Sequence, residues 1–145
     1  MNKKEYHTFS PEETMEAAKE IASSLAPGAV IALHGDLGAG KTVFSRAFAR
    51  ALGITEHVSS PTFTIVQEYA YGAGHMLYHL DLYRIDNPES ALAFGVDEFL
   101  YDTNAISLVE WPERIEGLFP PHTLHIHIRH LGENERLLTL EKPNL

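Results

Sequence analysis

One eight-residue segment, G-D-L-G-A-G-K-T at residues 35–42, constrains the fold more than any other part of the chain. It matches the pattern G-x-x-x-x-G-K-[ST] of a phosphate-binding loop (P-loop), in which backbone N–H groups close around phosphate oxygens. Such a loop needs a buried strand before it and a helix after it, whose N-terminus faces the phosphates. The apolar run at 29–34 predicts that strand, and the pattern at 41–52 predicts that helix.

The residues of this loop have predicted roles in holding a nucleotide. Lys41 would place its charge on the β- and γ-phosphates, and Thr42 would offer its hydroxyl to Mg²⁺. We expect Lys41 to be an exposed charge on a loop rather than part of the core. The predicted nucleotide-binding residues of the loop are Asp36, Leu37, Gly38, Ala39, Gly40, Lys41 and Thr42.

The rest of the hydrophobic pattern predicts a sheet with helices packed on it. Ser10, Pro11 and Glu13 are typical of a helix start, and apolar residues follow at helical spacing. Further strands are predicted at 62–70, 75–82, 105–110, 123–129 and 136–141, and short helices at 87–94 and 97–101. We therefore predict an α/β fold, a P-loop nucleotidase sandwich with a mixed, mostly parallel sheet, flanking helices and antiparallel edge hairpins. With 145 residues, the chain is expected to be one domain, 1–145.

Composition limits the chemistry and the partners of the chain. It contains no cysteine, which excludes disulfides, thiolate catalysis and cysteine zinc sites. The longest apolar run, 29–33, is far short of the roughly 20 residues of a membrane span, so we expect a cytoplasmic protein with no membrane contact. The net charge is −9 and no basic face is visible, so a partner protein would have to hold any nucleic acid.

Two acids end predicted strands and could complete a nucleotide site. Glu110 ends the strand 105–110, and Asp81 lies at the end of 75–82. Both strands could lie beside the strand before the P-loop, with their carboxyl ends at the ligand crevice. One carboxylate would hold Mg²⁺ while another polar group orients the attacking water, and the pattern leaves either acid in either role. Thr62 lies in a polar loop that could fold over the γ-phosphate as a switch.

The nine histidines do not predict a metal site. His125 and His127 share one face of a predicted strand, and His130 is near them. No cysteine supports them and no acid lies closer than Glu133, so polar, solvated histidines are the favoured interpretation. We expect His34, next to the P-loop, to pack against its neighbours.

Four segments together resemble the bacterial TsaE (YjeE) family. They are GDLGAGKT at 35–42, SPTFT at 60–64, HLDLYR at 79–84 and LVEWP at 108–112. The last two make the resemblance specific, because a P-loop alone occurs in many families. The resemblance implies an ATPase, using ATP and Mg²⁺, that supports formation of threonylcarbamoyladenosine beside the anticodon of tRNA. It further implies that the ATP cycle resets a complex of the TsaD and TsaB proteins, and that these partners hold the tRNA.

The resemblance also implies roles for single residues. Thr42 and Glu110 match the Mg²⁺ ligands of the family, and Asp81 matches the acid implicated in hydrolysis, to which we assign activation of water. Thr62 matches the switch-like loop, and Trp111 matches the tryptophan beside the nucleotide. The catalytic residues that the resemblance implies are Lys41, Asp81 and Glu110.

Other function classes share a P-loop. A small-molecule kinase usually carries an arginine-bearing lid, and no arginine-rich insertion is visible here. A GTPase would carry an N-K-x-D element after the acid strand, and nothing after Glu110 resembles it. A binding module could hold a nucleotide as a structural ligand. Because no arginine is an obvious finger for the γ-phosphate, we expect slow hydrolysis by the chain alone.

Overall fold

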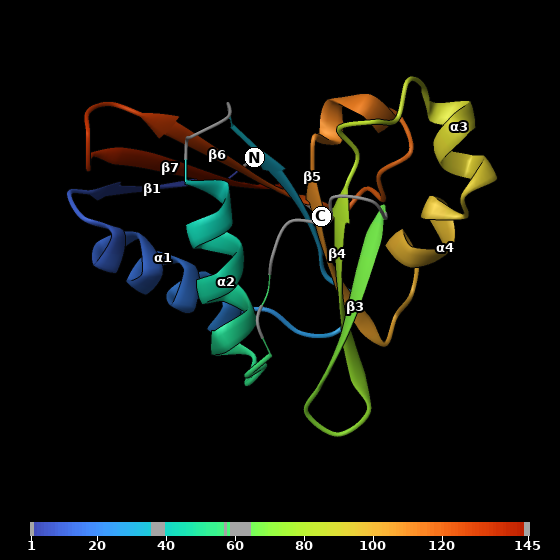
Figure 1. Ribbon diagram of the computed structural model, residues 1–145, viewed down its shortest axis with the longest axis horizontal. Helices are drawn as coiled ribbons and strands as arrows, with labels where there is room; N and C mark the ends of the chain where they lie inside the picture. Colours follow the sequence, from blue (N-terminus) through green and yellow to red (C-terminus); the bar gives the residue numbers. More distant parts are fainter. Residues whose placement is uncertain (1, 36–39, 57, 59–64, 144–145) are drawn as a thin grey trace.

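The computed structural model describes residues 2–35, 40–56, 58 and 65–143, and its centre is a seven-stranded sheet (Figure 1). The strands are β1 (Asn2–Thr8), β2 (Val30–His34), β3 (Val66–Tyr71), β4 (His75–Asp81), β5 (Ala105–Glu110), β6 (Leu124–His130) and β7 (Arg136–Lys142). Their order across the sheet is β1-β7-β6-β2-β5-β4-β3. The four neighbouring strands β6, β2, β5 and β4 are parallel, and the remaining pairs are antiparallel. The predicted fold class is confirmed.

The helices lie on both faces of the sheet. They are α1 (Pro11–Ser23), α2 (Lys41–Ala51), α3 (Pro88–Ala93), α4 (Val96–Leu100) and the 3₁₀-helix η1 (Pro112–Ile115). Helices α1 and α2 lie side by side over one face, and α3 and α4 cover the other face at the opposite end of the sheet (Figure 1). No helix within the described ranges is long and apolar enough to cross a membrane.

Alternation along the strands divides the apolar residues into two cores. Leu77, Ile106 and Leu108 pack in the core that contains α1 and α2. Their neighbours Tyr78 and Val109 belong to the core under α3 and α4. Successive side chains of a strand point to opposite faces, so the direction of any central strand residue follows from its parity. This parity determines which polar side chains of neighbouring strands can meet.

Predicted helix starts are confirmed in detail. The Ser10 hydroxyl accepts a hydrogen bond from the Glu13 N–H at 3.1 Å, and the Glu13 carboxylate reaches back to the Phe9 N–H at 2.8 Å. The Asn87 side chain accepts from the Ser90 N–H at 2.9 Å at the start of α3. Each cap satisfies a backbone donor that the first turn of a helix leaves unpaired.

Two strands differ from the prediction. The sequence pattern predicted no strand before Ser10, yet β1 pairs antiparallel with β7 and forms the outer edge of the sheet. Most of its residues are exposed, so no apolar alternation marked it. The strand predicted at 62–70 begins at Val66, and positions 62–64 of that prediction lie outside the described residues.

Candidate functional site

The described residues of the predicted site lie where β2, β5 and β4 end. Helix α2 begins at Lys41, directly after Gly40, whose φ of 101° lies in the left-handed region that glycine tolerates best. Of the two acid-bearing strands, only β5 pairs with β2; β4 lies one strand further out, beside β5. The predicted site residues Asp36, Leu37, Gly38, Ala39 and Thr62 lie outside the described residues.

Lys41 is buried, which corrects the prediction that it is an exposed charge on a loop. Its exposed fraction is 6%, and it is the first residue of α2. Its Nζ lies over the ring of Trp111, 4.5 Å from the ring centroid. An ammonium in this position is attracted to the negative face of an indole. The glycine-rich sequence around Lys41 predicted a solvent-exposed charge, but the tertiary fold buries it.

Trp111 adopts an unusual backbone conformation that brings its ring to this place. Its φ of 60° is the only positive value at a non-glycine residue in the described part of the chain. Such a conformation costs on the order of 1–3 kcal/mol and persists where the surroundings impose it. Here Tyr83 packs against the ring at 5.0 Å between centroids, and the Arg114 guanidinium lies 5.8 Å from it. The left-handed residue between β5 and η1 therefore carries an aromatic ring that lies beside Lys41 at the start of α2.

Asp81 and Glu110 are direct neighbours at the ends of two parallel strands. They are partners in the β4–β5 register, and the parity of both strands directs them to the face that carries α1 and α2. Glu110 is 3% exposed, and its Oε2 lies 2.5 Å from Nε2 of His79, which is also buried. Asp81 accepts a hydrogen bond from the Tyr83 N–H at 3.0 Å.

The pKa of Asp81 depends on the other residues of the site. Burial raises the pKa of its carboxyl above the usual value, and the charge of Glu110 adds to that rise. The Tyr83 N–H and the nearby charges of His79 and Lys41 lower the same pKa. A carboxylate with a raised pKa holds a proton more readily, which suits a group that accepts one.

Hard oxygen donors suit Mg²⁺, and the site offers them. Glu110 supplies a carboxylate, and Thr42, exposed in the first turn of α2, carries a hydroxyl. Among the described residues, no group of three or more histidine, cysteine or acidic side chains could hold a metal ion. Mg²⁺ is commonly bound by one or two protein oxygens and takes its other ligands from phosphate and water, and the donor types of Glu110 and Thr42 fit that pattern.

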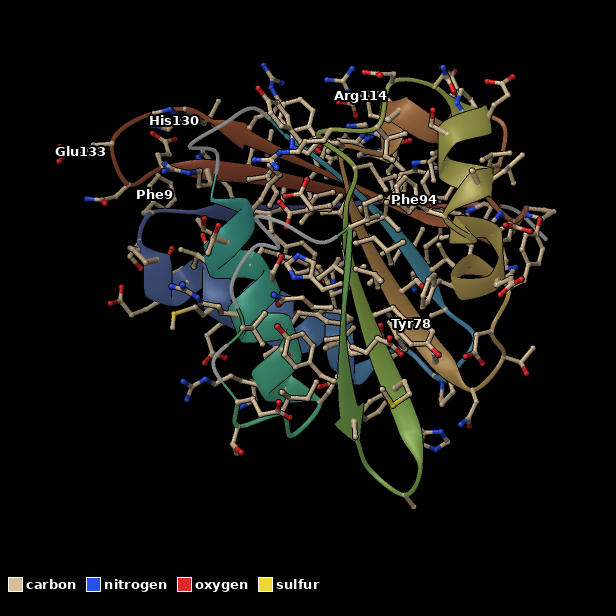
Figure 2. All side chains as sticks on the ribbon, turned by 45° about the vertical axis from the view of Figure 1, so that its right-hand side comes forward. Phe9, Tyr78, Phe94, Arg114, His130 and Glu133 are labelled. Atoms are coloured by element: carbon tan, nitrogen blue, oxygen red, sulfur yellow. The ribbon has the colours of Figure 1, made fainter. Side chains whose placement is uncertain are left out.

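Three histidines pack on the opposite face of the sheet, as a cluster next to the P-loop. His34 Nε2 lies 3.0 Å from His125 Nδ1, and its ring stacks on His127 at 4.3 Å. Of these three, His34 and His127 line an open hollow of about 830 Å³, together with Gly35 and Trp111. Packing was the predicted role of His34. Figure 2 shows His130 and Glu133 at the outer end of the β6–β7 hairpin.

Sequence reasoning missed two residues of the site region, His79 and Arg136. His79 could have been found, because it stands two positions before Asp81 and so shares its strand face. Arg136 gave no signal. Its Nη1 donates to the carbonyl oxygens of Gly132, Glu133 and Glu135, and its Nε lies 3.5 Å from the place that a Cβ on Gly40 would take. The β6–β7 hairpin thereby brings a guanidinium against the last glycine of the P-loop.

Comparison with known proteins identifies the family. The family model described as threonylcarbamoyl adenosine biosynthesis protein TsaE matches residues 8–138. The chain belongs to the TsaE family. The tRNA threonylcarbamoyladenosine biosynthesis protein TsaE of Bacillus subtilis is 45% identical over 139 residues, which cover 96% of this chain and 85% of the relative. The TsaE protein of Rickettsia conorii is 38% identical over 136 residues, 92% of this chain and 76% of the relative.

A solved structure of a similar protein supports the fold of this TsaE chain. The crystal structure of YdiB from Bacillus subtilis superimposes with a TM-score of 0.83 and 40% sequence identity. The match covers 99% of this chain and 87% of that one.

The contact between Lys41 and Trp111 can be tested with the only tryptophan of the chain. Replacing Lys41 with Met keeps an apolar stem over the ring and removes the ammonium, so the lost cation–π attraction and the relieved desolvation oppose each other and the unfolding free energy should change by at most about 2 kcal/mol. The folded protein should show changed Trp111 fluorescence. The same change at Lys19, an exposed lysine of α1, is the control and should leave the emission unaltered. Identical emission from both variants and the parent would contradict the stacked arrangement.

The histidine cluster should make the fold sensitive to acid. Burial lowers the pKa of His34 from 6.5 to about 4, with the charges of His127, His125 and Lys41 acting in the same direction. Between these two values the unfolded chain binds a proton that the folded chain does not, so stability falls as the pH falls through this window. His34→Asn should reduce that slope by less than the ~1.4 kcal/mol per pH unit of a whole proton.

Urea unfolding at a series of pH values measures this slope. His130→Asn is the control, because it removes an exposed imidazole at the end of β6, the strand that carries His125 and His127. A slope that His34→Asn leaves unchanged would show that His34 titrates alike in both states.

Proposed function

We propose that this chain is a Mg²⁺-dependent ATPase that supports threonylcarbamoyladenosine modification of tRNA. The observation that carries the proposal is the convergence of Lys41, Asp81 and Glu110 at the carboxyl edge of the parallel strands. Asp81 and Glu110 are register partners, Lys41 influences the pKa of Asp81, and Lys41 contacts the residue that follows Glu110. An ammonium at the start of a P-loop helix, with two carboxylates at the ends of neighbouring strands, supplies groups that nucleotide hydrolysis uses.

Each residue receives one role in this proposal. Lys41 leaves the Trp111 ring to meet the β- and γ-phosphates, beside the backbone of residues 36–42. Thr42 and Glu110 hold Mg²⁺, which when bound neutralises charge on the phosphate oxygens. Asp81 orients the attacking water and accepts its proton, a role that its raised pKa favours.

The TsaD and TsaB proteins are the proposed partners, and the ATP cycle of this chain would reset their complex between rounds of modification. The net charge of −9 supports a division of labour in which the partners hold the tRNA. Thr62, in the switch-like loop, would sense the γ-phosphate. A finger residue from a partner can raise hydrolysis by ~10³–10⁵-fold, so we expect the chain alone to be slow.

Substitutions at Glu110 and Asp81 should affect nucleotide binding and nucleotide hydrolysis differently. Glu110→Gln should weaken nucleotide binding only when Mg²⁺ is present, because it alters a cation ligand. Asp81→Asn should leave binding intact and slow hydrolysis, because it removes the group that accepts a proton. Titration of a fluorescent ATP analogue with and without Mg²⁺, together with phosphate release, measures both effects. The opposite pattern would exchange the two roles.

Reconstitution tests the function as a whole. Unmodified tRNA is incubated with TsaD, TsaB, the threonylcarbamoyl-AMP synthase, threonine, bicarbonate and ATP. Modified adenosines per TsaD are then counted with this chain, without it, and with its Lys41→Ala variant. We expect multiple turnovers only with the intact chain, because the variant lacks the charge that holds the phosphates. Equal counts in all three reactions would contradict the reset role and favour a kinase or a nucleotide-binding module.

A further inference from the structure

We propose that His79 is a positioning residue that fixes the direction of the Glu110 carboxylate toward a bound divalent cation. The inference rests on the proposed function, because it assumes that Glu110 holds Mg²⁺. His79 itself touches neither nucleotide nor cation in this proposal. Its effect passes through the carboxylate.

The placement of the pair follows from strand parity and register. His79 and Asp81 lie two positions apart on β4 and face the same side of the sheet as Glu110 on β5. In the register His79 is opposite Leu108, so Glu110 is its diagonal neighbour. The two side chains meet between the strands at 2.5 Å, His79 Nε2 to Glu110 Oε2.

Because both groups are buried, this hydrogen bond holds the Glu110 carboxylate in one orientation. His79 is 1% exposed and Glu110 is 3% exposed, so water competes little for either group. An ionised carboxylate only accepts hydrogen bonds, so in this arrangement the Nε2–H of His79 is the donor and Oε2 of Glu110 is the acceptor. With one oxygen held in this way, the carboxylate cannot rotate freely, and its second oxygen takes a defined direction.

The other ring nitrogen indicates that the contact with Glu110 decides the orientation of His79. The buried Nδ1 of His79 has no hydrogen-bond partner among the described residues. A buried polar atom without a partner lowers stability by on the order of 1–3 kcal/mol, so a purely structural site would favour an apolar side chain here. Carboxylates that bind metal ions are commonly held by such an outer hydrogen bond, and its loss weakens metal affinity by ~10–100-fold.

Three substitutions of His79 distinguish the effect of its hydrogen-bond donor from the effect of its ring volume. In His79→Gln the amide nitrogen stands near the place of Nε2 and can still donate to Glu110. In His79→Asn the shorter amide stands near the place of Nδ1 and cannot reach. His79→Leu removes every polar atom at similar volume. Thermal unfolding of the full chain shows which variants fold, and Asn covers the case in which Leu does not.

The readout is the Mg²⁺ concentration at which half of the protein binds a fluorescent ATP analogue, with electron paramagnetic resonance of Mn²⁺ as a second probe. Leu and Asn should raise this concentration by ~10–100-fold, while Gln stays near the parent. Binding of the analogue without Mg²⁺ should be equal in all variants, which a merely structural role would not produce.

Glu110→Gln distinguishes failure of this inference from failure of the proposed function. If Glu110→Gln raises the Mg²⁺ requirement and the Leu and Asn variants do not, the role of His79 is overturned and that of Glu110 stands. If Glu110→Gln leaves the requirement unchanged, the proposed cation site is overturned and the role of His79 with it. Equal losses of Mg²⁺-free binding in the Gln, Asn and Leu variants would also overturn the inference.

Discussion

The parallel pairing of β2, β5 and β4 is the constraint on which the site depends. It aligns the carboxyl ends of three strands, so that Leu33 stands opposite Glu110 and Glu110 opposite Asp81. The helix α2 starts at the same edge, because its strand β2 lies next to β5. Long connections are needed to make strands parallel, and helices supply them. The geometry of the site is thus a consequence of the sheet rather than of any loop by itself.

Burying charged groups at this edge opposes stability and favours chemistry. Lys41 and Glu110 are both nearly inaccessible, and Trp111 holds a strained backbone between them. Taking charge out of water is costly, yet electrostatic effects grow where water is excluded. Aromatic contact at Lys41 and a histidine contact at Glu110 offset part of this cost. The same contacts hold both groups near the carboxyl edge of the parallel strands.

The two faces of the sheet carry different chemistry. The face with α1 and α2 carries Asp81, Glu110 and His79, whereas the histidine cluster around His34 lies on the other face. His34 is nevertheless the residue before Gly35, and Lys41 lowers its pKa. The histidine cluster and the residues of the proposed site are therefore linked through one strand, β2.

The sequence by itself determined the P-loop, the strand and helix beside it, the caps at Ser10 and Asn87, and the two acids at strand ends. These are local patterns, because spacing and turn chemistry act over a few residues. Tertiary structure alone decided that β1 forms the sheet edge, that Lys41 is buried under Trp111, and that Arg136 reaches Gly40. It also chose β5 rather than β4 as the neighbour of β2. Each of these depends on residues far apart in the chain, whose meeting is set by sheet order and packing.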